Sequence, residues 1–192
     1  MFYLLESDPM APKYSYLTST AFINNLEFDY MEAFSFQRSF VFEENNSKEL
    51  KEYERLKNRL REFTELSSAE ISEFERLKMY HESTHYIVNS HGEFHPSAEK
   101  TGTFDKKSPV VEKLRQILNT PIKTIPSWMC GPTYRDAIVF YDSRSTIVAT
   151  LNVCLSCEYM ETSAFNFVNS DQLVYRLLRD FFVEIGHSVE QH

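Results

Sequence analysis

The pattern of apolar and polar positions is most regular between residues 134 and 155, where it predicts a β-hairpin. Residues 134–142 are mainly apolar, β-branched and aromatic, which indicates a central strand covered on both faces. Residues 147–155 alternate strictly between two faces after a short polar segment, as antiparallel strands do. The apolar face of this second run consists of Ile147, Ala149, Leu151, Val153 and Leu155.

The turn of this hairpin sets its register. A tight turn over residues 142–145 places Phe140 opposite Ile147, and extending the same ladder places Cys130 opposite Cys157. Directly opposed side chains come close to the reach of a disulfide. The turn contains no Asn-Gly or Asp-Gly, and a proline interrupts the extension. A register slip of one residue and a break before Cys130 are therefore open alternatives.

Helical spacing of apolar residues predicts the other main elements. Ser67 and Glu70 form a capping-box pattern that starts a second helix directly after the first long one. We predict short extended segments over residues 36–42 and 84–88 and a polar loop over 93–107. We predict helices over residues 20–34, 47–66, 67–83, 108–119 and 170–185.

These elements predict an α+β fold in a single domain, residues 1–192. Its centre is a small antiparallel sheet formed by the hairpin 134–155, within a helix–hairpin–helix core over residues 108–187. Residues 47–83 form a helical hairpin or one kinked helix with an amphipathic stripe. That stripe can serve a partner helix, but packing on the sheet is the favoured prediction.

Composition narrows the classes of partner. The 192 residues carry a net charge of −8, which argues against nucleic acid and against an anionic membrane surface. An acidic chain is compatible with a basic protein partner, although acidity also serves solubility. Four glycines leave no glycine-rich loop for a nucleotide phosphate.

The same composition predicts a cytoplasmic protein. Residues 1–6 lack the basic start of a signal peptide, and no apolar run approaches the roughly 20 residues of a membrane span. Three cysteines without a secretory signal are typical of a reducing compartment, where thiols are free or bind metal.

Residues 81–85, His-Glu-Ser-Thr-His, match the HExxH pattern of zinc hydrolases. On a helix, His81 and His85 share one face and can bind one zinc ion, while Glu82 activates the bound water. His91 has the spacing of a third ligand. Against this interpretation, Val88 stands where a glycine is required, and the residues after Glu82 disfavour helix. A helix end that enters a strand is the favoured interpretation.

The three cysteines form a second candidate site. Cys130, Cys154 and Cys157, with a histidine such as His187, have the residue types of a structural zinc site. A Cys154-x-x-Cys157 thiol pair predicts redox or sensor chemistry instead. Buried, inert cysteine is the plainest interpretation.

Arg135-Asp136 begins the first strand of the hairpin, with the aspartate directed to the apolar face. A buried ion pair or a strand-end salt bridge is the plain explanation, and a ligand site is a weaker one.

The segments Cys130-Gly131-Pro132-Thr133-Tyr134-Arg135 and Cys154-Leu155-Ser156-Cys157 carry a resemblance. The chain resembles, over residues 108–187, a group of uncharacterised bacterial proteins with a Cys-x-Pro-x-x-Arg hairpin that ends in Cys-x-x-Cys. The resemblance implies a hairpin followed by a C-terminal helix, and it implies no activity.

We therefore expect a cytoplasmic bacterial protein that binds another protein, of accessory or immunity type, rather than an enzyme. The alternatives are a zinc-dependent hydrolase and a thiol redox protein. Zinc is the cofactor under the first alternative, and no cofactor is predicted otherwise.

Overall fold

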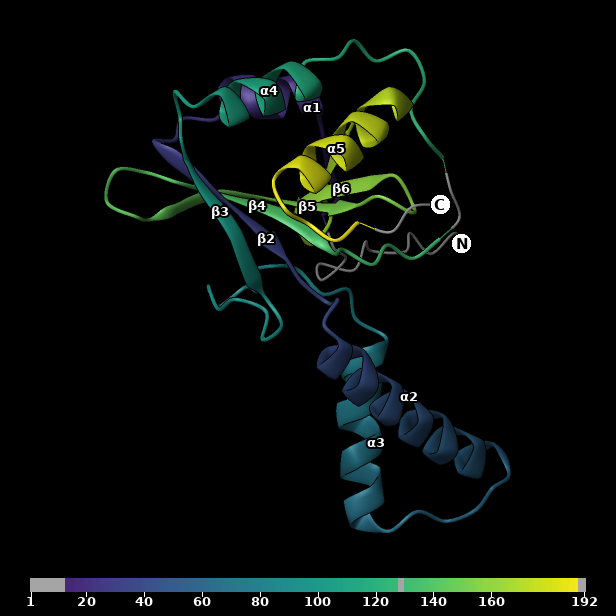
Figure 1. The fold of residues 1–192 in the computed structure, drawn as a ribbon. Helices are drawn as coiled ribbons and strands as arrows, with labels where there is room; N and C mark the ends of the chain where they lie inside the picture. Colours follow the sequence, from purple (N-terminus) through teal and green to yellow (C-terminus); the bar gives the residue numbers. More distant parts are fainter. Residues whose placement is uncertain (1–12, 128–129, 190–192) are drawn as a thin grey trace, which may run out of the picture.

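Strand β4, Asp136–Tyr141, is an interior strand of a mainly antiparallel sheet, and all six of its residues are buried. The computed structural model, which describes residues 13–127 and 130–189, has an α+β fold (Figure 1). The prediction of a central strand covered on both faces is confirmed. The strand order within the described residues is β1-β7-β6-β5-β4-β2-β3, so the sheet is not small.

The remaining elements have the following bounds. The other strands are β1 (Ser15–Thr18), β2 (Tyr30–Ser35), β3 (Glu99–Asp105), β5 (Ile147–Cys154), β6 (Tyr159–Ser163) and β7 (Asn166–Asn169). The helices are α1 (Ser19–Asn25), α2 (Phe40–Arg61), α3 (Ser68–His81), α4 (Pro109–Leu118) and α5 (Gln172–Glu184).

The β4–β5 hairpin has the predicted faces over residues 149–155 but not the predicted register. Phe140 pairs with Ala149, two residues beyond the predicted Ile147. The turn is one residue longer than expected, since the Asp142 amide donates to the Thr146 carbonyl, and a bulge then adds a second residue. Beyond the bulge, a shift of two residues keeps the side chains on their predicted faces, because strand side chains alternate with a period of two. Ile147 lies before the bulge and packs with Tyr141 on the other face, so its predicted place beside Ala149 is wrong.

Several predicted elements outside the hairpin are wrong. The helix predicted over residues 20–34 ends at Asn25, and β2 follows it. Residues 36–42 are not one extended segment, because α2 begins at Phe40. The polar loop predicted over 93–107 contains β3, an edge strand whose mostly polar, exposed residues gave no apolar signal. In the segment 84–88, only Val88 forms a bridge, to Phe94.

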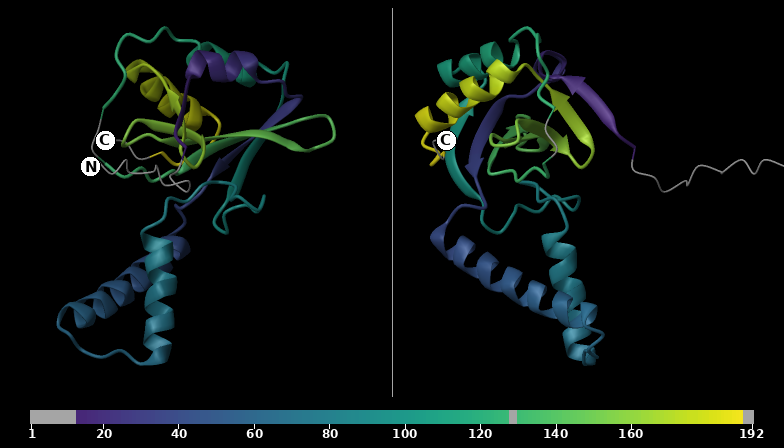
Figure 2. Two further views of the ribbon diagram at one scale, coloured as in Figure 1. Left: turned by 180° about the vertical axis from the view of Figure 1, so that it is seen from behind. Right: turned by 90° about the vertical axis from the view of Figure 1, so that its right-hand side faces the viewer.

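The sheet has two differently covered faces. Helices α1, α4 and α5 cover one face, as Figures 1 and 2 show, and Phe140, Leu151 and Phe181 lie in the core beneath them. This arrangement confirms the predicted packing of helices 108–119 and 170–185. The other face has no helix in those views, and the segment after α3 contributes buried Ile87 to its apolar cluster.

Helices α2 and α3 form a helical hairpin, here called the arm, that projects away from the sheet (Figures 1 and 2). Its own small core is Tyr53, Leu56 and Leu77, with Leu66 and Phe74 packed against it. The capping box at Ser67 and Glu70 is confirmed. The prediction that this hairpin packs on the sheet is wrong, because the narrow apolar stripes of the two helices face each other.

No helix within the described residues is long and apolar enough to cross a membrane. Two predictions concern residues outside the described part of the chain. They are the missing signal peptide over residues 1–6 and, over residues 128–129, part of the break expected before Cys130 and of the resembling segment 108–187.

Candidate functional site

The HExxH segment does not form the helical zinc site that its pattern predicts. Helix α3 ends at His81 and is capped by Glu82, so His85 lies beyond the helix. The ring of His85 turns back, with Nε2 2.9 Å from the Tyr80 carbonyl oxygen. His91 is exposed in the following turn. The prediction that the residues after Glu82 leave the helix is confirmed.

Glu82 is hydrogen-bonded to a residue of α2 instead. Its Oε1 accepts a hydrogen bond of 2.5 Å from the Tyr53 hydroxyl, and this bond lowers the pKa of the Glu82 carboxyl. A zinc hydrolase needs that carboxylate beside an open coordination position. Across residues 13–127 and 130–189, no three His, Cys, Asp or Glu side chains are placed to hold a metal ion.

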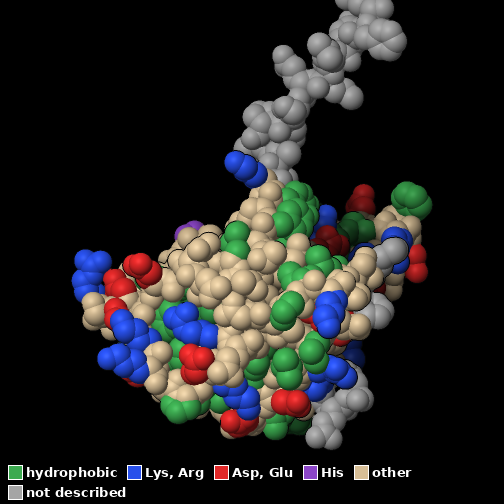
Figure 3. Space-filling view, turned by 90° about the horizontal axis from the view of Figure 1, so that it is seen from above, with side chains coloured by type: hydrophobic (Ala, Val, Ile, Leu, Met, Phe, Trp, Pro, Cys, Tyr) green, Lys and Arg blue, Asp and Glu red, His purple; other side chains and the backbone are tan. Residues whose placement is uncertain are grey.

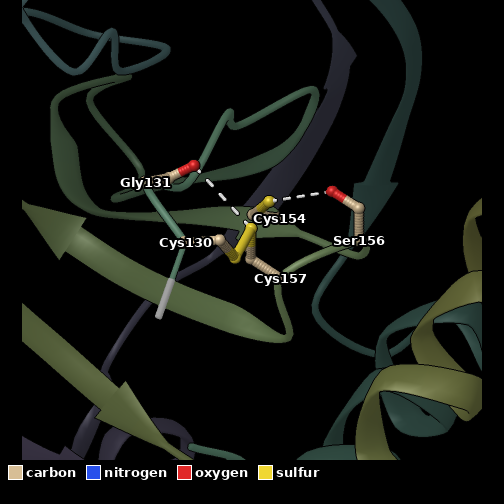
Figure 4. The surroundings of a disulfide bond; sticks show 5 residues. All are labelled: Cys130, Gly131, Cys154, Ser156 and Cys157. Carbon is tan, nitrogen blue, oxygen red and sulfur yellow. Dashed lines mark hydrogen bonds between the residues drawn. A yellow bond between two sulfur atoms is a disulfide. The ribbon is translucent and has the colours of Figure 1, made fainter. Parts of the chain in front are cut away.

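Two of the three cysteines form a disulfide (Figure 4). Cys130 and Cys157 are bonded, with their Cα atoms 6.3 Å apart, while Cys154 is free and buried. The prediction that placed Cys130 opposite Cys157 therefore identified the bonded pair. The two cysteines meet at the turn after β5, however, and not along an extended strand ladder. The predicted redox pair Cys154-x-x-Cys157 is wrong, and so is the expectation of three free or metal-binding thiols.

Asp136 is the centre of a buried polar cluster, here called the Asp136 cluster. Its two carboxylate oxygens accept hydrogen bonds from Arg38 at 2.5 and 2.7 Å, and Oδ1 also accepts one from His187 Nδ1 at 2.7 Å. On its other side, the His187 ring Nε2 lies 2.8 Å from Thr101 Oγ1. The prediction that Asp136 forms a buried ion pair is confirmed, and its partners are Arg38 and His187.

Electrostatics keep Asp136 ionised. Burial raises the cost of its charge, but the hydrogen bonds from His187 and Arg38 outweigh that cost and lower the pKa of the Asp136 carboxyl. No local sequence signal identifies these partners, because Arg38 lies 98 residues and His187 lies 51 residues from Asp136.

The Asp–His–Thr chain resembles a nucleophile relay in outline only. The Thr101 hydroxyl is also within 3.2 Å of the Ala33 carbonyl, to which it donates, and the His187 side chain is wholly buried. A nucleophile needs access to substrate and a base free to take its proton. This series of hydrogen bonds therefore has a structural role and connects β2, β3, β4 and the segment after α5.

The arm carries the most exposed apolar side chains of the described residues. Phe63, in the loop between α2 and α3, is 96% exposed, and Phe40, Val41 and Met79 are also largely exposed. The face seen from above shows basic and acidic side chains interspersed with hydrophobic ones (Figure 3). The arm tip, defined here as residues 60–65, is thus the stronger candidate for contact with a partner.

Comparison of the chain with protein-family models, with curated proteins and with solved structures finds no match. The assignment of a function therefore depends on the geometry of the molecule.

Proposed function

We propose that the chain acts by binding another protein through the arm tip, with the Phe63 ring as the anchor. The observation that supports this proposal is an almost fully exposed aromatic ring on a backbone with a φ of 57°. Aromatic anchors in pockets dominate the energetics of many protein interfaces. A strained residue that is almost fully exposed among the described residues is a reasonable starting point for a functional hypothesis.

The backbone of Phe63 terminates α2 in the manner usually assigned to glycine. The Phe63 amide donates to the Leu60 carbonyl at 3.2 Å, and the Thr64 amide donates to the Arg59 carbonyl at 2.9 Å. This pair of bonds is the Schellman motif, whose left-handed position is most often glycine. A residue with a Cβ there costs about 1–2 kcal/mol. Neither helix termination nor internal packing requires phenylalanine at this position.

The charges around Phe63 indicate the chemistry of the partner. Glu62 and Glu65 flank the ring in the sequence and are exposed. Arg61, the basic residue of the arm tip, is also exposed, so the two glutamates leave the tip with one net negative charge. A fitting partner is a protein with an apolar pocket bordered by basic side chains, in keeping with the net charge of −8. An accessory or immunity role, in which a small acidic chain covers a basic surface, fits this chemistry.

The test uses Phe63→Gly, a change that separates binding from stability. Glycine suits the left-handed backbone, so this variant is expected to be at least as stable as the wild type, by up to about 1 kcal/mol. The same change removes the anchoring ring. Proteins that co-purify with each variant from the native cells are quantified, together with the thermal melting of each variant.

Met79→Gln is the matched control, because Met79 is also largely exposed on the arm but lies at the far end of α3 from the tip. We expect at least one protein to be retained by the wild type and by Met79→Gln and lost with Phe63→Gly. Identical sets of co-purifying proteins for wild type and Phe63→Gly would overturn the proposal. Destabilisation by Phe63→Gly would also count against it, since the ring would then have a structural role.

A further inference from the structure

A hollow lies where the base of the arm meets the sheet, and we call it the junction hollow. Its lining comes from Tyr80 near the end of α3, from the segment 84–96 that follows the arm, and from residues 163–164 at the end of β6. The hollow has a volume of about 670 Å³. This volume lies within the roughly 300–1,000 Å³ of pockets that take small organic molecules.

Five ring-bearing side chains line the junction hollow. Tyr80, Tyr86 and Phe94 contribute aromatic rings, and His85 and His95 contribute two imidazoles whose ring centroids lie 5.6 Å apart. Aromatic rings pack on one another in offset-stacked and edge-to-face arrangements that aliphatic groups cannot reproduce. The lining therefore favours a ligand that itself contains a flat aromatic ring.

Contacts with other side chains hold several of these rings in place. The centroids of the Tyr80 and His85 rings are 4.4 Å apart, and His85 Nε2 donates to the Tyr80 carbonyl at 2.9 Å. The Tyr86 ring stacks on Tyr134 with centroids 5.5 Å apart, and the Tyr86 hydroxyl donates to the buried carboxylate of Glu161. Rings that are fixed before a ligand arrives lower the cost of ordering the site on binding.

The charge of the lining favours a cation. Glu93 is the one acidic residue among the described residues that line the hollow, and these include no Lys or Arg. The carboxylate of Glu93 accepts a hydrogen bond from Asn89 Nδ2 at 2.9 Å. Burial lowers the pKa of His95 to about 4, so that ring is neutral at pH 7 and adds no positive charge. A cleft whose fixed charge has one sign attracts ligands of the opposite sign.

A tight turn positions Glu93 at the hollow. Asn89 Oδ1 accepts hydrogen bonds from the amides of His91 and Glu93 at 2.9 and 3.0 Å. The Asn89 amide donates to the Glu93 carbonyl at 2.9 Å, and Gly92 supplies the left-handed backbone of the turn with a φ of 80°. The carboxylate is thus held in the turn directly before Phe94.

From these features we propose that the junction hollow binds a small aromatic amine, a molecule with one flat ring and one protonated amino group. The ring packs among the aromatic side chains of the lining, and the ammonium group is attracted both by Glu93 and by the faces of the rings. An anion meets the Glu93 carboxylate with its own charge, and an aliphatic amine leaves the rings without a stacking partner.

This site is separate from the arm tip. The tip, residues 60–65, precedes α3, whereas Tyr80 lies near the other end of that helix. The tip offers a single exposed ring to a protein, whereas the junction hollow offers several rings and a carboxylate to a small molecule. Failure of one proposal leaves the other unaffected.

The test measures the binding of tryptamine to the whole chain by calorimetry at low ionic strength. Two further probes separate the parts of the proposal: indolepropionate keeps the ring but reverses the charge, and pentylamine keeps the charge but has no ring. We expect saturable binding of tryptamine and a Kd at least about 10-fold higher for each of the other two probes. A Kd for either of them as low as that of tryptamine would overturn the assignment.

Glu93→Gln tests the charge of the lining. We expect it to raise the Kd of tryptamine by about 3- to 5-fold, because an exposed carboxylate attracts a cation only modestly, and to leave the Kd of indolepropionate unchanged or lower. Glu99→Gln is the matched control, since Glu99 is also exposed but lies outside the lining. It is expected to leave both Kd values unchanged.

Phe94→Leu tests the rings, because leucine keeps an apolar side chain but removes an aromatic face. We expect the Kd of tryptamine to rise by about 3- to 10-fold. Phe165→Leu is the control: both phenylalanines are 39% exposed, but Phe165 does not line the hollow. Equal Kd values for wild type, Glu93→Gln and Phe94→Leu would overturn the proposal.

A second measurement uses the wild-type chain alone, so it does not depend on the folding of any variant. Amide spectra are recorded during titration with tryptamine, and shifts are expected at residues 84–86, 93–95 and 163–164. Shifts confined to other parts of the chain would overturn the placement of the site, and so would the absence of saturable binding.

Discussion

The arm and the sheet differ in how far apart in sequence their stabilising contacts lie. The arm core is Tyr53, Leu56 and Leu77, all from two helices that follow each other in the chain. The core beneath α1, α4 and α5 instead joins residues from Phe22 to Phe182. Short-range contacts form easily but bury little, whereas long-range contacts bury much and form together. The arm is therefore the part most able to unfold by itself.

The two regions also differ in how deeply their ion pairs are buried. On the arm, Arg55 pairs with Glu52 and Arg76 pairs with Glu73, all well exposed to solvent. Such surface pairs contribute little to stability. The Asp136 cluster is buried, so removing one member leaves the other groups without partners, which is strongly unfavourable. The stability of the sheet therefore depends on its buried polar groups, whereas the stability of the arm depends little on its surface ion pairs.

The largest expected effect comes from placing the same charge in each region. Leu151→Asp puts an unpaired carboxylate into the apolar face of β5, where Leu151 is wholly buried. We expect a loss of several kcal/mol in the free energy of unfolding, roughly 4 kcal/mol or more. Leu50→Asp on α2 is the matched change at a residue that is 44% exposed, with an expected loss below about 1 kcal/mol.

Denaturant unfolding of the two variants checks this contrast. Similar midpoints for Leu151→Asp and wild type would show that the face assignment of β5 is wrong. A loss for Leu50→Asp as large as that for Leu151→Asp would show that the arm is part of one cooperative unit with the sheet.

The next effect is local. Leu77→Ala removes a wholly buried side chain from the arm core, and such truncations cost about 2–5 kcal/mol. Because α2 and α3 pack mainly on each other, we expect the arm to open while the sheet stays folded. Hydrogen exchange should accelerate over 40–81 and stay slow over 136–154. Faster exchange in both segments would contradict an independently unfolding arm.

Local signals explain which parts of the fold could be predicted. The capping box at Ser67 and Glu70 and the apolar faces of α4 and α5 identify helices from neighbouring residues alone. The two-residue period of β5 predicts in the same way that Leu151 and Val153 share one face, although residues 151–154 are buried on both faces. Strand β3 could not be found, because its residues are polar and its pairing with β2 depends on a distant segment.

The candidate sites show the same difference between features that neighbouring residues predict and features that depend on distant segments. Asp136 could be predicted as buried from its place on the apolar face of β4, but nothing near it indicates Arg38 or His187. The exposed Phe63 follows a long helix in the sequence, yet only the projection of the arm away from the sheet explains why no described residue covers its ring.

The smallest expected effect concerns glutamates with opposite pKa shifts in the two regions. Burial raises the pKa of the Glu161 carboxyl above 4.5, although the Tyr86 hydroxyl donates a hydrogen bond to it. On the arm, the hydrogen bond from Arg76 lowers the pKa of Glu73 below 4.5. A group with a raised pKa in the folded state binds its proton more tightly there than in the unfolded chain. Its contribution to stability is therefore complete below pH 4.5 and is lost as the pH rises through the folded value.

Glu161→Gln removes this loss, so the variant should gain stability over the wild type as the pH rises from 4.5 to 7, by about 1 kcal/mol or less. Glu73→Gln is the control of opposite sign, because the contribution of Glu73 is present above pH 4.5 and is lost as the pH falls through its folded value. Unfolding midpoints at pH 4 and pH 7 for the wild type and both variants measure the difference. A pH dependence for Glu161→Gln that matches the wild type would show that the Glu161 carboxyl is already well solvated in the folded chain. The two glutamates would then differ only in their neighbours, and burial in the sheet would not be the cause of the opposite shifts.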